Sequence, residues 1–186
     1  MSEMLGKLIE VIQMGDFVVL DTETTGLLVG EVCEIAIVAA NGSVAYQSMV
    51  RPRNGIPLDA TRIHGIEDAH VVNAPTWPEV QPAILPLLTG AHVLVYNATY
   101  DRKMLHQSAE AWDMPKTDWK TLGSWHCLME AFAEVYGDWN HYHQSYRWQP
   151  LHRAASHYHI DFPGEHSAIG DAKMAWRVAC RMGGLE

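Results

Sequence analysis

The segment Phe17–Leu27 reads FVVLDTETTGL and places two acidic residues at the end of the most strand-like run in the chain. Four apolar residues lead into Asp21 and Glu23, and Gly26 ends the run. Side chains two residues apart on a strand point to the same face, so the two carboxylates are expected about 6–7 Å apart along it. Carboxylates this close repel each other when both are ionised. Any fold that contains this segment therefore needs a compensating positive charge at the end of the strand.

The composition predicts one folded domain over residues 1–186. The chain is 48% hydrophobic and 19% charged, which is typical of globular proteins with a sizeable core. No apolar run is long enough to span a membrane, and the N-terminal residues lack a signal-peptide pattern. Three scattered cysteines (Cys33, Cys127 and Cys180) favour a reducing, cytoplasmic environment. The net charge of −9 argues against a nucleic-acid partner unless bound cations neutralise several of the acids.

Hydrophobic periodicity and turn residues predict a mixed sheet covered by helices. Residues 3–14 carry apolar residues at helical spacing and are expected to form an N-terminal helical extension. The Asn41–Gly42 pair predicts a hairpin turn between two strands, whereas Pro82 and Pro86 weaken the helical pattern around them. Strands are expected at 16–21, 31–40, 43–50, 91–97 and 123–127, helices within 51–66 and at 77–88, 98–111, 128–136, 150–159 and 167–182, and an irregular loop at 138–148.

Two further patches place acidic residues where predicted elements meet. Tyr96–Asp101 reads YNATYD and follows a predicted strand, so Asp101 falls in the first turn of the next helix. A helix N-terminus favours a carboxylate through its dipole, and this alone would explain Asp101 as well as a functional role does. His166–Ala172 reads HSAIGDA and begins the last predicted helix, with Asp171 in its first turns and close to the core. A carboxylate in that position needs a partner.

The three patches together indicate a single site at one edge of the sheet. Four carboxylates, those of Asp21, Glu23, Asp101 and Asp171, would not stay ionised side by side without cations. Ligands that are all oxygen suit the hard ions Mg²⁺ and Mn²⁺. Two such ions stabilise the attacking and leaving oxygens of a phosphodiester during hydrolysis. Histidine is the side chain best suited to take a proton from water near neutral pH, which makes His166 the candidate general base.

In order and spacing, these patches resemble the motifs of the DEDDh family, the DnaQ-like 3′–5′ exonucleases. This family includes polymerase proofreading exonucleases and exonuclease X. DTETTGL resembles its first motif, YNATYD its second and HSAIGDA its third, and the His-x-x-x-x-Asp spacing is typical of the histidine-bearing subgroup. RIHGI at Arg62–Ile66 also resembles a family element, and the resemblance covers about residues 16–182. Tyr96 and Tyr100 replace the usual His and Phe, but neither is a ligand position.

The resemblance implies a ribonuclease H-like α/β fold, a five-stranded mixed sheet with helices on both faces. It implies metal-dependent hydrolysis at the 3′ end of single-stranded DNA, with release of nucleoside 5′-monophosphates. Asp21, Glu23, Asp101 and Asp171 would bind two divalent ions, Mg²⁺ or Mn²⁺, with His166 as general base. The substrate-binding residues would be Thr24, Thr25, Leu27, His64 and Asn97.

Other functions stay open on the sequence alone. The first alternative is an exoribonuclease of the same family that acts on short RNA. Of the two possible substrates, the 3′ ends of single-stranded DNA are favoured over those of RNA. An inactive module that binds nucleic acid or docks on a polymerase would have lost an acid, and none is lost. An unrelated metal phosphoesterase would not require three ordered patches. A polymerase or repair partner is implied by the resemblance, and the sequence assigns no oligomeric state.

The tract His141–Trp148, HYHQSYRW, has two functional interpretations beside a structural one. A zinc site at His141 and His143 is disfavoured, because the spacing matches no zinc motif. A stacking platform for single-stranded substrate would use Tyr142, Tyr146 and Trp148, with Arg147 on phosphate. A loop that packs its aromatic residues on the domain is the favoured interpretation. Four arginines could contact the substrate backbone, but scattered arginines are usually solvated, and that is the favoured interpretation for Arg51, Arg53, Arg62 and Arg102.

Overall fold

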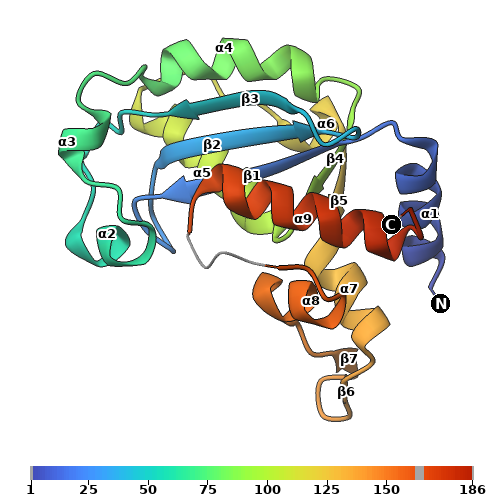
Figure 1. Ribbon diagram of the computed structural model, residues 1–186. Helices are drawn as coiled ribbons and strands as arrows, with labels where there is room; N and C mark the ends of the chain where they lie inside the picture. Colours follow the sequence, from blue (N-terminus) through green and yellow to red (C-terminus); the bar gives the residue numbers. More distant parts are fainter. Residues whose placement is uncertain (1, 162–165, 186) are drawn as a thin grey trace.

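A five-stranded sheet lies at the centre of the computed structural model, which describes residues 2–161 and 166–185 (Figure 1). The strand order is β3-β2-β1-β4-β5. The first three strands are antiparallel neighbours, whereas β4 and β5 continue the sheet in parallel with β1. The expected five-stranded mixed sheet is therefore confirmed. The strands are β1 (Val18–Thr24), β2 (Val32–Ala39), β3 (Val44–Met49), β4 (His92–Val95) and β5 (Ser124–Cys127).

Helices cover both faces of this sheet (Figure 1). One face packs against α1 (Glu3–Met14), α7 (Leu128–Tyr136), α8 (Leu151–His157) and α9 (Ala168–Met182). The other packs against α4 (Trp77–Leu88), α5 (Ala98–Ala111) and the short α6 (Trp119–Leu122). Two further short helices, α2 (Leu58–His64) and α3 (Asp68–Val71), lie beyond the end of the sheet where β1 finishes. The sequence pattern had not indicated α3 or α6.

The two faces of β1 belong to different cores, and this sets the direction of its polar residues. Val19 is buried on the α9 side, whereas Leu20 is buried on the α5 side. Because side chains alternate along a strand, Asp21 and Glu23 follow Val19 onto the α9 side. Thr22 follows Leu20 onto the opposite side. The apolar start of the strand therefore fixes where the two acids point.

β1 continues to Thr24, three residues past the predicted end at residue 21. The acidic residues stay in the sheet because β2 pairs with them, Asp21 opposite Ala36 and Glu23 opposite Glu34. The predicted helix at 77–88 is confirmed as α4 in spite of Pro82 and Pro86. Both prolines are exposed, so the carbonyl oxygens that lose a backbone partner there can bind water instead.

The prediction of an irregular loop at 138–148 is wrong for two short stretches, which form strands on either side of a turn. Trp139–Asn140 and Ser145–Tyr146 form a small antiparallel hairpin, β6 and β7, which projects from the α7–α8 side of the molecule (Figure 1). The rings of Trp139 and Tyr146 meet edge-on with centroids 4.9 Å apart, and this cross-strand contact holds so short a pair of strands together. Periodicity cannot detect strands of two residues.

None of the helices in the described part of the chain is long and apolar enough to cross a membrane.

Candidate active site

Three carboxylates meet where β1 ends beneath the first turn of α9. Asp21 and Glu23 come from β1, and Asp171 comes from α9. Each offers one oxygen, and these three oxygens all lie within 4.8 Å of one another. The Ser167 side chain accepts a hydrogen bond from the backbone N–H of Gly170 and caps α9. This cap fixes where the helix begins and so places Asp171 over the strand.

The oxygen atoms of Asp171 show that the group suits a cation. Oδ1 is buried and has no hydrogen-bond partner among the residues that the structure describes. Oδ2 lies 3.8 Å from Nδ1 of His166, whose side chain is 55% exposed. A buried acceptor without a donor is costly, and a metal ion among three carboxylate oxygens would satisfy it. The oxygen-only donor set matches Mg²⁺ or Mn²⁺.

Asp101 approaches the site from the other face of the sheet. It lies in the first turn of α5, is 4% exposed, and accepts a 2.8 Å hydrogen bond from the Thr22 hydroxyl. Asp101 is not part of the three-oxygen group, but it is close enough to Asp21 for its charge to raise the pKa of that residue. The structure therefore brings three of the four predicted metal ligands into one group and places the fourth beside Thr22.

Burial and mutual repulsion raise the pKa values of these carboxyl groups. Burial, followed by the charges of Asp101 and Asp171, raises the pKa of Asp21 well above its ordinary value. Burial raises the pKa of Glu23 to about 8, and the charge of Asp171 adds to the effect. Burial also raises the pKa of Asp101 to about 7, although the hydrogen bond from Thr22 acts in the opposite direction. Full ionisation of the cluster at neutral pH therefore requires bound positive charge.

These raised pKa values predict that the metal-free protein loses stability as the pH rises. Glu23 has an ordinary pKa of 4.5 and a folded-state pKa of about 8, so between these values the folded state binds more protons than the unfolded state. Stability then falls as pH increases across this window. In the presence of a chelator, we expect the Tm to fall by several degrees between pH 5.5 and 8, because ~1 kcal/mol shifts the Tm by about 2–4 °C at this size.

Two additions make this thermal measurement specific. Mn²⁺ should raise the Tm more at pH 8 than at pH 5.5, since the metal competes with protons for the same oxygens. The Glu23→Gln variant, measured with chelator, should show a weaker dependence on pH. A wild-type Tm that stays constant or rises over this range would contradict the predicted protonation.

Glu34 is a site residue that sequence reasoning missed. It is 3% exposed, lies opposite Glu23 on β2, and its Oε2 accepts a 2.9 Å hydrogen bond from the backbone N–H of Ala168. Ala168 is the first residue of α9, so Glu34 ties the start of that helix to the sheet. The signal was a second acid, three residues after Glu31, inside the run EVCEIAIVAA, which otherwise reads as a strand buried on both faces.

Removing the Glu34 carboxylate should therefore disturb both stability and catalysis. In Glu34→Ala the buried N–H of Ala168 loses its acceptor, which should cost about 1–3 kcal/mol of unfolding free energy. We also expect a lower kcat, because Asp171 lies on the helix that Glu34 positions. Glu34→Gln keeps an acceptor oxygen and should retain most of the unfolding free energy and most of kcat. Denaturant unfolding and steady-state kinetics test this, and equal losses in the two variants would contradict a positioning role.

A hollow of about 270 Å³ opens beside the three-oxygen group. Its lining includes Thr24 and Leu27 from the end of β1 and the turn after it, His64 from α2, and Asn97 and Tyr100 from the start of α5. Leu27 is 72% exposed at its rim. The His64 ring lies 3.3 Å from the Thr24 carbonyl oxygen, and Asn97 is exposed at the helix start. Four of the five predicted substrate-binding residues therefore share one cavity wall.

Thr25, the fifth of these residues, closes the turn instead of lining the hollow. Its hydroxyl accepts a 2.8 Å hydrogen bond from the N–H of Glu31, and its own N–H donates to the Glu31 carbonyl oxygen. Tyr100, which stands where the family usually has Phe, uses its hydroxyl in the same region. It hydrogen-bonds with the Thr24 hydroxyl and donates to the Gly26 carbonyl oxygen. Both contacts hold the turn that carries Leu27.

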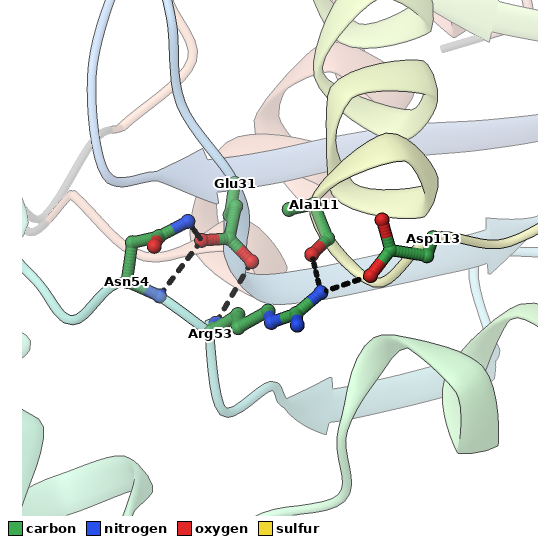
Figure 2. A network of polar contacts seen from close by, with 5 residues as sticks. All are labelled: Glu31, Arg53, Asn54, Ala111 and Asp113. Atoms are coloured by element: carbon green, nitrogen blue, oxygen red, sulfur yellow. Dashed lines mark hydrogen bonds and ion pairs between the residues drawn. The ribbon is translucent and has the colours of Figure 1, made fainter.

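A polar network anchors this turn to the rest of the protein (Figure 2). The buried carboxylate of Glu31 accepts hydrogen bonds from the backbone N–H groups of Arg53 and Asn54 and from the Asn54 side chain. The Arg53 guanidinium donates to Asp113 at 2.7 Å and to the Ala111 carbonyl oxygen at the end of α5. Arg53 is exposed, as expected, and its side chain also joins two loops beside the hollow.

Comparison with known proteins gives a family match over most of the chain. The exonuclease family model RNase T matches residues 18–179. The uncharacterized exonuclease CP81 of Escherichia phage 186 is 32% identical over 163 residues, covering 86% of this chain and 84% of that protein. The PolC-type DNA polymerase III of Caldanaerobacter subterraneus subsp. tengcongensis is 28% identical over 175 residues. That match covers 90% of this chain but only 12% of the polymerase.

Solved structures show the same fold at lower sequence identity. The nuclease domain of 3′hExo, a DEDDh family member bound to rAMP, superimposes with a TM-score of 0.68 at 18% identity, covering 90% of this chain and 91% of that one. Exonuclease X in complex with 5′ overhanging duplex DNA gives a TM-score of 0.62 at 22% identity, covering 90% and 93%. The expected ribonuclease H-like architecture is confirmed.

Proposed function

Because this chain belongs to the DEDDh exonuclease family, we propose that it removes nucleotides from the 3′ end of single-stranded DNA and releases nucleoside 5′-monophosphates. The observation that carries the proposal is the three-oxygen group of Asp21, Glu23 and Asp171, with its buried unpartnered oxygen, beside a hollow. Hydrolysis of a phosphodiester needs charge stabilisation and a bound chain end at adjacent places. The three-oxygen group would supply the charge stabilisation through bound metal, and the hollow would hold the chain end.

In this proposal the chain holds two divalent ions, Mg²⁺ or Mn²⁺. Asp21, Glu23 and Asp171 would hold one, and Asp21, with Asp101 beside it, would contribute to holding the second. When bound, the ions would stabilise the charges that develop on the attacking and leaving oxygens. His166, whose Nδ1 lies 3.8 Å from Asp171 Oδ2, would take the proton from the attacking water.

The hollow would receive the terminal nucleotide. The backbone at Thr24 would orient it, Leu27 would press on its base from the exposed rim, and His64 and Asn97 would complete the wall. Thr25 would contribute through the turn that it closes. We place the enzyme in the cytoplasm, where the free thiols of its three cysteines stay reduced. The similarity to a polymerase supports a polymerase or repair complex as partner.

An exoribonuclease that acts on short RNA is the second candidate. The 3′hExo nuclease domain, which shares the fold, was solved with rAMP. The ratio of the rates on DNA and RNA separates this candidate from the first.

The direct test uses matched single-stranded DNA and RNA oligonucleotides labelled at the 5′ end. With Mg²⁺ or Mn²⁺, the wild-type protein should shorten the DNA stepwise from the 3′ end, and a chelator should stop it. The ratio of the two rates assigns the sugar preference. Binding without shortening of either strand, with both metals present, would overturn the proposal and favour an inactive docking module.

A further inference from the structure

A basic groove runs along the solvent side of α5, away from the three-oxygen group. It has a volume of about 710 Å³ and lies between α5 and the segment 116–120. Four of the 13 lysines and arginines of the chain line it, together with a histidine. We propose that this α5 groove binds the sugar-phosphate backbone of the substrate strand on the 5′ side of the nucleotide being removed. The basic residues are Arg102, Lys103, His106, Lys116 and Lys120.

The charge in the groove is opposite to that of the protein as a whole. The chain has 22 acidic residues and 13 lysines and arginines. Among the described residues that line the groove, by contrast, four are lysine or arginine and one, Asp118, is acidic. The carboxylate of Asp118 accepts a hydrogen bond from the backbone N–H of Lys120 and caps α6. Within residues 2–161 and 166–185, none of the four cations forms an ion pair. The Arg102 guanidinium also lies over the Trp125 ring, 5.5 Å from its centroid. Cations gathered in this way on an acidic protein match a polyanionic ligand.

The groove and the hollow meet at the start of α5. Asn97 and Tyr100, at the start of α5, line the hollow, whereas Thr99 and Arg102 line the groove. Thr99 and the three groove residues after it on α5 follow the spacing i, i+3, i+4, i+7, so they form one stripe along the helix. With a rise of 1.5 Å per residue, this stripe is about 10 Å long. A strand leaving the hollow across the first turn of α5 would meet it directly.

The inference rests on the proposed function, because it assigns a path to the same substrate. Lysine and arginine neutralise phosphates without reading sequence, which suits an enzyme that must move along any strand. The groove also answers the objection raised by the net charge of −9, because phosphate would be bound by a local cluster of cations on α5 and opposite it, whatever the sign of the total charge.

The test compares two double variants that each remove two positive charges. Lys103→Gln with Lys116→Gln takes one exposed cation from each wall of the groove. Lys7→Gln with Arg153→Gln removes two exposed cations from α1 and α8 as the matched control. The substrates are a long single-stranded DNA and the p-nitrophenyl ester of thymidine 5′-monophosphate. The ester ends at the hollow and so reports the catalytic centre alone.

For the groove variant, we expect KM for the long strand to rise by roughly five- to tenfold with kcat unchanged, while the ester is hydrolysed as before. The slope of log KM against log salt concentration should fall by about 0.7 for each lost phosphate contact. An unchanged KM and salt slope, or an equal effect in the control variant, would overturn the groove. If the wild-type protein with metal hydrolyses neither substrate, it is the proposed function that fails.

Discussion

The Asp171→Asn variant is expected to lose Mg²⁺-dependent exonuclease activity by on the order of 10³-fold or more. Asp171 supplies one of the three oxygens that meet within 4.8 Å, and within residues 2–161 and 166–185 its buried Oδ1 has no hydrogen-bond partner. The asparagine side chain keeps the size and one acceptor oxygen but removes the negative charge. The loss of activity would therefore come from the missing negative charge and not from a cavity left by a smaller side chain. Asp21→Ala should be similarly inactive, because Asp21 belongs to the same group.

A matched control lies on the same helix. Lys173→Gln changes an exposed residue two positions further along α9 and should leave the rate close to wild type. Thermal unfolding in increasing Mn²⁺ gives a second readout that needs no substrate. The wild-type Tm should rise with metal concentration, and the Asp171→Asn protein should show a much smaller rise. Mg²⁺-dependent shortening of DNA at a near-wild-type rate in Asp171→Asn would exclude the proposed metal site.

The part of the site that could be predicted is the part set by local periodicity. Asp21 and Glu23 share a face because side chains alternate along a strand, and Asp171 falls in the first turns of the helix predicted at 167–182. The position of Asp101 relative to them was not predictable in this way. Its contact with Thr22, on the opposite face of β1, depends on how α5 packs under the sheet.

Glu34 and Glu31 show a second limit. Each is one acidic residue in or beside a strand that reads as buried, and the sequence gives no sign of its partner. Glu34 binds the start of α9, which lies 134 residues further along the chain. Glu31 binds a loop 22 and 23 residues away. Propensity and spacing act over a few residues, so buried polar contacts over such separations emerge only from the folded structure.

The His166→Ala variant is expected to lose on the order of 10²–10⁴ in kcat, with binding of DNA largely kept. His166 lies immediately before α9, with Nδ1 3.8 Å from Asp171 Oδ2 and with just over half of its side chain exposed. It is therefore accessible to water at the edge of the three-oxygen group, and it contributes little to the buried core. Loss of a general base lowers the rate of the chemical step but leaves the hollow and the metal ligands in place.

His64→Ala provides the contrast that separates proton transfer from substrate binding. His64 lines the hollow and contacts the Thr24 carbonyl oxygen, so its loss should raise KM more than it lowers kcat. Free imidazole should restore part of the rate in His166→Ala, because it can take the proton that the missing side chain would take. It should not restore His64→Ala. A His166→Ala enzyme that keeps its full rate at neutral pH would show that another group takes the proton, and equal rescue of both variants would show that imidazole acts elsewhere.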